Sequence, residues 1–111
     1  GANMIFVITN DGWWGDTPGH KQHFEMSKLR AIENRRSIAR SANTGISGFI
    51  NQRGDVVECS NYWEPTALRN TINANDEMTF YSRHGDYIYR AASFIAILVL
   101  CFTFVISIKK R

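Results

Sequence analysis

The sequence contains few cysteines, and their positions exclude most of the roles that cysteine plays in proteins. Only Cys59 and Cys101 occur among the 111 residues, the first in a predicted strand and the second inside an apolar stretch. Two cysteines in such different surroundings do not form a disulfide framework. Cys59 follows Glu58 and has no adjacent base or cation to favour its thiolate. We therefore interpret Cys59 as an inert strand residue and Cys101 as a small apolar side chain.

The sequence also lacks the short motifs that mark common catalytic sites. It has no GxSxG nucleophile turn and no glycine-rich phosphate loop. His20 and His23 lie three residues apart with Asp16 nearby, but no third and fourth ligand follows at a spacing that suits zinc. We interpret both histidines as surface residues near the start of a helix, and we expect neither a metal site nor a cofactor.

Positive charge is modest, because 13 Lys and Arg residues stand against 10 Asp and Glu residues, a formal net charge of +3. Part of it gathers in an arginine cluster, formed by Arg30, Arg35, Arg36 and Arg40. Acidic residues are interleaved with it, and no nucleic-acid-binding motif is present. The cluster therefore favours a solvated or phospholipid-facing surface, and nucleic acid is not an expected partner.

One long apolar segment is present, at residues 91–108, and it contains no charged residue. As a helix it would be about 27 Å long, close to the hydrocarbon thickness of a bilayer. The alternative is a buried core helix, but the mostly polar remainder is too short to surround it. We predict a transmembrane helix at 91–108, a juxtamembrane linker at 81–90 and a basic tail at 109–111. The tail carries three positive charges against two before the helix (Arg83 and Arg90), which favours a cytoplasmic C-terminus.

The preceding residues predict an α/β arrangement of one strand, one helix and several strands. Residues 4–9 form a continuous apolar run, typical of a strand buried on both faces. Thr17 and Pro18 suit the N-cap and first position of a helix that extends to about residue 35. Its apolar stripe is predicted at Met26, Leu29 and Ile32, with Phe24 and Ala31 to one side. Further strands are expected at 37–42, 46–50, 56–59 and 66–72, the last at a sheet edge.

Residues 10–55 carry a resemblance to a known family. The stretch NDGWWGDTPGHKQHFEMSKLRAIENRRSIARSANTGISGFINQRGD resembles the later part of the carbon–nitrogen hydrolase (nitrilase) domain. It is more similar to the apolipoprotein N-acyltransferases, bacterial enzymes that add the third acyl chain to lipoproteins. TFYSRHGD, at 79–86, is similar to that family's entry into its last membrane helix.

The resemblance implies the C-terminal part of a nitrilase-like αββα sandwich at residues 1–80, on the outer (periplasmic) face of the bacterial inner membrane. The implied reaction transfers an acyl chain from phospholipid to the N-terminal amine of a diacylated lipoprotein through a cysteine thioester, with a glutamate base and an oxyanion-stabilising lysine. In the family those three residues precede this region. The fragment alone is therefore expected to be inactive, and the parent protein to be a monomer in contact with the lipid bilayer.

The resemblance also implies that the loop at 10–16 opens near the nucleophile. Asn10 and Asp11 would then shape the pocket by hydrogen bonds, while Trp13 and Trp14, followed by Gly15, would contact lipid at its entrance. The alternative is that one tryptophan packs on the helix and the other is merely half-buried. Asn43 is a further candidate for the same pocket, although we favour a plain turn there.

Two other functions remain open from the sequence alone. One is an amide-hydrolysing nitrilase relative with an added membrane helix. The other is a non-enzymatic, tail-anchored binding module that is complete as it stands. In the second case the strand at 4–9 would lack its expected neighbours and expose an edge prone to aggregation.

Overall fold

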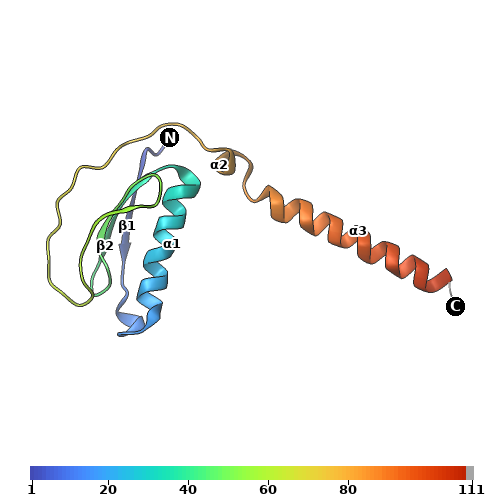
Figure 1. The fold of residues 1–111 in the computed structure, drawn as a ribbon, viewed down its shortest axis with the longest axis horizontal. Coiled ribbons are helices and arrows are strands. Elements are labelled where there is room, and N and C mark those ends of the chain that lie inside the picture. Colours follow the sequence, from blue (N-terminus) through green and yellow to red (C-terminus); the bar gives the residue numbers. More distant parts are fainter. Residues whose placement is uncertain (110–111) are drawn as a thin grey trace.

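A computed structural model describes residues 1–109 and shows a small α/β domain joined to a long C-terminal helix (Figure 1). Two residues of the predicted basic tail, 110 and 111, lie outside the described residues. The elements in chain order are β1 (Met4–Thr9), a 3-10 turn η1 (Gly12–Trp14), α1 (Pro18–Asn34), β2 (Ser37–Ala42), β3 (Gly48–Ile50), β4 (Val56–Cys59), α2 (Phe80–His84) and α3 (Tyr87–Lys109).

The strands form one sheet in the order β1-β2-β3-β4. β1 and β2 are parallel and are connected through α1, whereas β2, β3 and β4 pair antiparallel. The α1 helix begins as predicted, with the Thr17 side chain accepting a hydrogen bond from the Gly19 backbone N–H and Pro18 at the first position. The predicted α/β class is confirmed.

The α1 helix covers one face of the sheet. Phe24 and Ala31 pack against Ile38 and Ile50, and these four residues form the buried apolar core. The prediction that Met26, Leu29 and Ile32 form the buried stripe is wrong, because all three are exposed. The helix instead buries His20, Phe24, Ser27 and Ala31, which recur at helical spacing but include polar and small side chains that a search for large apolar residues overlooks.

The other face of the sheet is largely uncovered. Phe6 is 69% exposed and Ile8 is 89% exposed, although Ile5 and Val7 of the same strand pack towards the core. The prediction that β1 is buried on both faces is therefore wrong for the described residues. Its apolar run was typical of a doubly buried strand, but nothing within residues 1–109 covers the second face completely.

The predicted strand at 66–72 is also absent. This segment is irregular, and it lies beside β4 through a side-chain contact in which Asn70 donates to the Glu58 carboxylate at 3.0 Å. A four-residue strand such as β4 offers a short template for backbone pairing, and Pro65 removes a donor at the start of the segment.

The C-terminal helix is longer than predicted. It starts at Tyr87 rather than at residue 91, because the Asp86 side chain accepts a hydrogen bond from the Tyr89 N–H at 3.1 Å. The expected linker at 81–90 therefore contains part of α2 and the first turn of α3. By length and composition α3 is capable of crossing a membrane, and it is not buried against the domain. α2 contacts the end of α1, where Thr79 Oγ1 donates to the Glu33 carbonyl at 2.6 Å.

Candidate functional site

Three connecting segments meet at the end of the sheet where the parallel strands β1 and β2 terminate. The loop after β1 contacts the turn after β2, since Asn43 Nδ2 donates to Asn10 Oδ1 at 2.7 Å and the Asp11 N–H donates to Asn43 Oδ1 at 3.1 Å. The segment after β4 joins the same turn, because the Trp63 N–H donates to the Thr44 carbonyl at 3.0 Å. The structure thus brings together the predicted site residues Asn10, Asp11 and Asn43.

A fully buried carboxylate lies at the centre of this end. Asp11 Oδ2 accepts a hydrogen bond from Arg40 Nη2 at 2.8 Å, and both side chains are almost completely buried. Its Oδ1 accepts a hydrogen bond from Thr9 Oγ1 at 3.0 Å and lies 2.9 Å from His23 Nδ1. The same His23 Nδ1 also lies 3.2 Å from Arg40 Nη2, so the imidazole contacts both members of the Asp11–Arg40 pair. Asp11 therefore joins β1, α1 and β2 in one polar cluster.

The environment of Asp11 favours its ionised form. Burial alone raises the pKa of a carboxyl group, but hydrogen bonds from His23, Thr9 and Arg40, together with the charge of Arg40, more than offset that effect. The pKa of Asp11 therefore lies below its ordinary value, and the side chain is a stable anion at neutral pH.

The arginine cluster does not form the single solvated surface that the sequence predicted. Arg40 is buried and, besides its contact with Asp11, donates to Ser27 Oγ at 2.9 Å and to the Ile46 carbonyl at 3.2 Å. Arg36 is also buried and donates to the backbone carbonyls of Ala2 and Glu77, each at 2.7 Å. Both residues connect distant parts of the chain, so only the remaining members of the cluster face solvent.

The two adjacent tryptophans occupy η1 at the tip of the loop. Trp13 is 85% exposed, whereas Trp14 is 48% exposed and its ring lies against Gly19, where an added Cβ would be 2.6 Å from Trp14 Cε3. Gly15 ends the turn with a φ of 56°, a conformation that favours glycine. Trp14 is thus positioned by the start of α1, and Trp13 projects from the domain.

The prediction that both histidines lie on the surface is wrong for His20. Its imidazole is fully buried and stacks on Tyr62, with ring centroids 4.1 Å apart. His23 remains partly exposed beside Asp11. Within residues 1–109, no group of three His, Cys, Asp or Glu side chains gathers in a way that could hold a metal ion.

Trp63 is a further aromatic residue at this end of the sheet, and it was not among the predicted site residues. It is 66% exposed and has a φ of 59°, which is unusual for a bulky side chain. Its backbone is held by the hydrogen bond to Thr44, and its ring lies next to that of Tyr62, with 5.9 Å between the ring centroids. In the sequence, the adjacent aromatic residues Tyr62 and Trp63, shortly before Pro65, could have indicated an aromatic loop here. We refer to Trp13, Trp14 and Trp63 together as the aromatic end.

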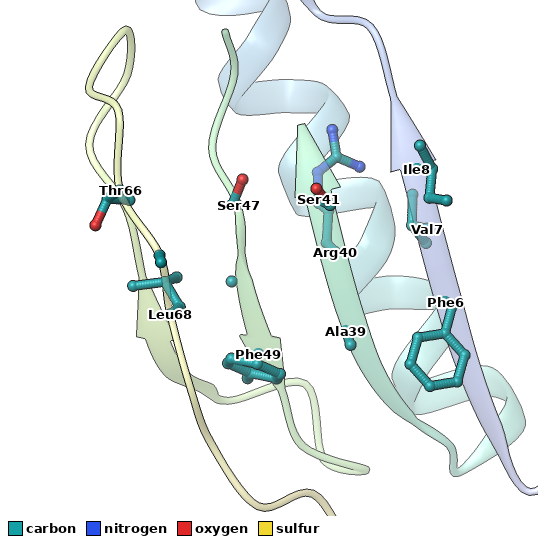
Figure 2. Close-up of a pocket in the computed structure, with 12 residues that line it drawn as sticks. Phe6, Val7, Ile8, Ala39, Arg40, Ser41, Ser47, Phe49, Thr66 and Leu68 are labelled. Atoms are coloured by element: carbon teal, nitrogen blue, oxygen red, sulfur yellow. The ribbon is translucent and has the colours of Figure 1, made fainter. Parts of the chain in front are cut away.

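The uncovered sheet face forms a cavity of about 530 Å³ between the strands and the segment at 66–68. Figure 2 shows Phe6 and Ile8 of β1 on the same side as Phe49 of β3, with Leu68 at the far wall. This cavity is mainly apolar and open, so it suits contact with another apolar layer.

Cys59 and Cys101 are both free and exposed, at the end of β4 and within α3 respectively. Among residues 1–109, the candidate site at this end of the sheet consists of the polar cluster around Asp11 and the exposed aromatic side chains.

Comparison with known proteins identifies close relatives. No family model matches the chain. It is similar to apolipoprotein N-acyltransferase from Chlorobaculum tepidum, with 36% identity over all of this chain and 20% of that protein. The protein of the same name from Agrobacterium fabrum is 38% identical over 90% of the chain and 19% of its own length. That of Allorhizobium ampelinum reaches 55% identity over 50% of the chain. The chain spans about one fifth of the length of the first two relatives.

Proposed function

The chain belongs to the apolipoprotein N-acyltransferase family, and from this premise we propose that it is the C-terminal part of a membrane-bound acyltransferase. The enzyme transfers an acyl chain from a phospholipid to the N-terminal amine of a diacylated lipoprotein. The observation that carries the proposal is the similarity along the entire chain to proteins of that name, together with a C-terminal helix that is apolar enough to span a bilayer. Neither the amide hydrolase nor the binding module is favoured by these relatives.

The proposed parent fold is a nitrilase-like αββα sandwich, of which residues 1–80 are one part. The uncovered sheet face, with Phe6 and Ile8, supports this, because an apolar face of that kind is normally covered by a second layer. The unpaired edge of β1 supports a further strand beside it, which in this family carries the nucleophilic cysteine. The catalytic glutamate, lysine and cysteine would then lie in other parts of the parent protein, and this chain by itself would be inactive.

The proposed location is the bacterial inner membrane, with the domain on the periplasmic face and α3 as the membrane helix. Positive charges at Lys109 to Arg111 exceed those of Arg83 and Arg90, which supports a cytoplasmic C-terminus.

The proposed role of the aromatic end is to contact the acyl chain or the membrane interface. Trp13 and Trp63 expose large apolar rings on loops that are fixed by hydrogen bonds, and tryptophan combines an apolar body with one N–H donor. The loop and its Gly15 turn would be held in place by Asn10, Asp11 and Asn43, which would not contact the lipid themselves.

A double substitution tests this role. In the native protein, Trp13→Ala with Trp14→Ala should lower the rate of acyl transfer from phospholipid roughly tenfold, the effect of losing about 1.4 kcal/mol of binding. The measurement is acylation of a diacylated lipopeptide, compared with Met26→Ala as a control, since Met26 is an exposed apolar residue of α1. Equal rates in the double variant and the control would refute lipid contact by this loop.

A further inference from the structure

We propose that Asp11 and Arg40 form a positioning pair that fixes the loop at residues 10–14 and thereby sets the rate at which the parent enzyme accepts its acyl donor. Neither residue touches substrate in this proposal. The inference rests on the proposed function for its kinetic part, whereas its structural part concerns this chain alone.

Arg40 fixes three segments that are far apart in the sequence. From its position on β2, its guanidinium group donates to Asp11 in the loop after β1, to Ser27 on α1, and to the Ile46 carbonyl before β3. A guanidinium group has five N–H donors in a rigid plane, so these contacts define the relative positions of the three acceptors.

Asp11 connects the Arg40 side chain to the loop at residues 10–14. Its carboxylate is held by Arg40, Thr9 and His23, while its own N–H donates to Asn43. The Trp14 N–H donates to the Asp11 carbonyl at 3.2 Å, so the η1 turn starts directly from the fixed residue. Gly45 packs so closely on the Asp11 side chain that an added Cβ would overlap the carboxylate, so the turn after β2 lies directly against Asp11.

Stability alone is a poor explanation for this pair. Burying two charges costs several kcal/mol of desolvation per ion, and apolar residues of similar volume are often as stabilising. Here the buried pair lies directly behind the loop that exposes Trp13, at the end of the parallel strands, whereas the exposed pairs of the domain lie on the surface of α1 and in the 51–55 turn. The position of the charges therefore matches a role in holding the loop.

The experiment compares Arg40→Lys and Asp11→Asn with Glu33→Gln in the native protein. Glu33→Gln is the matched control, because it weakens the exposed ion pair between Arg30 and Glu33 far from the loop. The first readout is hydrogen–deuterium exchange of the amides at 12–15. We expect exchange there to rise at least tenfold in both test variants, with β3 amides unchanged, and no rise in the control.

The second readout separates the two half-reactions of acyl transfer. We expect kcat/KM for acyl-enzyme formation from phosphatidylethanolamine to fall at least tenfold in Arg40→Lys, with little change in transfer from a preformed acyl-enzyme to a lipopeptide amine. Equal slowing of both steps, or a uniform rise of exchange over the whole sheet, would reduce the pair to a general structural contact and overturn the proposal.

Ser27→Ala keeps the test decisive if a test variant does not fold. It removes only one acceptor from Arg40 and should produce a smaller rise in exchange at the same amides. Unchanged exchange at 12–15 in every folded variant would refute the positioning pair. If the wild-type protein transfers no acyl group, the proposed function fails, but the exchange comparison still decides whether the pair fixes the loop.

Discussion

The two faces of the four-stranded sheet differ in how completely the described residues cover them. On one face, α1 buries Ile38 and Ile50 completely and adds a polar cluster around Asp11 and Arg40. On the other, Phe6 and Ile8 of β1 are exposed and border an open apolar cavity (Figure 2). Contacts within residues 1–109 bury the covered face but leave Phe6 and Ile8 of the open face largely exposed.

The difference supports the proposal that this chain is one layer of a larger protein. An exposed apolar sheet face and the open outer edge of β1 are both unfavourable in water, and the second also invites aggregation. Burial by another part of the parent protein would remove both problems at once.

The largest expected effect is on the covered face. Ile38→Ala should lower the free energy of unfolding by about 2–5 kcal/mol, because it leaves a cavity beneath α1. Ile8→Ala is the corresponding substitution on the open face, where Ile8 is 89% exposed in this structure. If a second layer covers Ile8 in the native protein, Ile8→Ala should lower the free energy of unfolding almost as much as Ile38→Ala does. Chemical denaturation of both variants measures this.

If Ile8→Ala changes the free energy of unfolding by less than about 0.5 kcal/mol, as ordinary surface substitutions do, then no second layer covers Ile8. Ile38→Ala then serves as the internal control, since its burial does not depend on any residue outside the chain.

The covered face should also respond to acid. The pKa of Asp11 is lowered in the folded protein, so its stabilising contribution is present above the ordinary value of about 3.9 and is lost as the pH falls through the folded value. We expect the unfolding midpoints of the wild type and Asp11→Asn to converge below about pH 4. A constant difference between the two proteins from pH 7 to pH 3 would disprove the contribution of the anion.

A smaller effect is expected at the start of α1. Thr17→Ala removes the side-chain acceptor for the Gly19 N–H and should cost about 1 kcal/mol. Thr17→Ser is the matched control and should retain most of the stability. Thermal unfolding of the wild type and the two variants measures the loss of stability. An equal loss in Thr17→Ala and Thr17→Ser would show that the side-chain cap does not stabilise the helix.

Local features of the fold were predictable from the sequence, whereas features that depend on distant residues were not. Thr17 and Pro18 predicted the start of α1, and the apolar run at 4–9 predicted β1, because each signal lies within a few neighbouring residues. The burial of Arg40 depends on Asp11, which is 29 residues away, so the arginine cluster looked like a solvated surface.

In the candidate site, too, the local features were predictable and those that depend on distant segments were not. The tryptophan pair and its turn were visible in the sequence, and Asn10 and Asn43 do lie together. Trp63 and the stacking of Tyr62 on His20 were missed, because they arise from a third segment that reaches the same end only in the folded chain.

The intact mass of the native protein purified from its own membranes tests directly whether this chain is part of a larger acyltransferase. We expect a mass about five times the 12.7 kDa of this chain, since the chain covers about 20% of the length of its relative from Chlorobaculum tepidum. A native mass near 12.7 kDa would contradict it, because acyl transfer would then lack the cysteine, lysine and glutamate that the family uses.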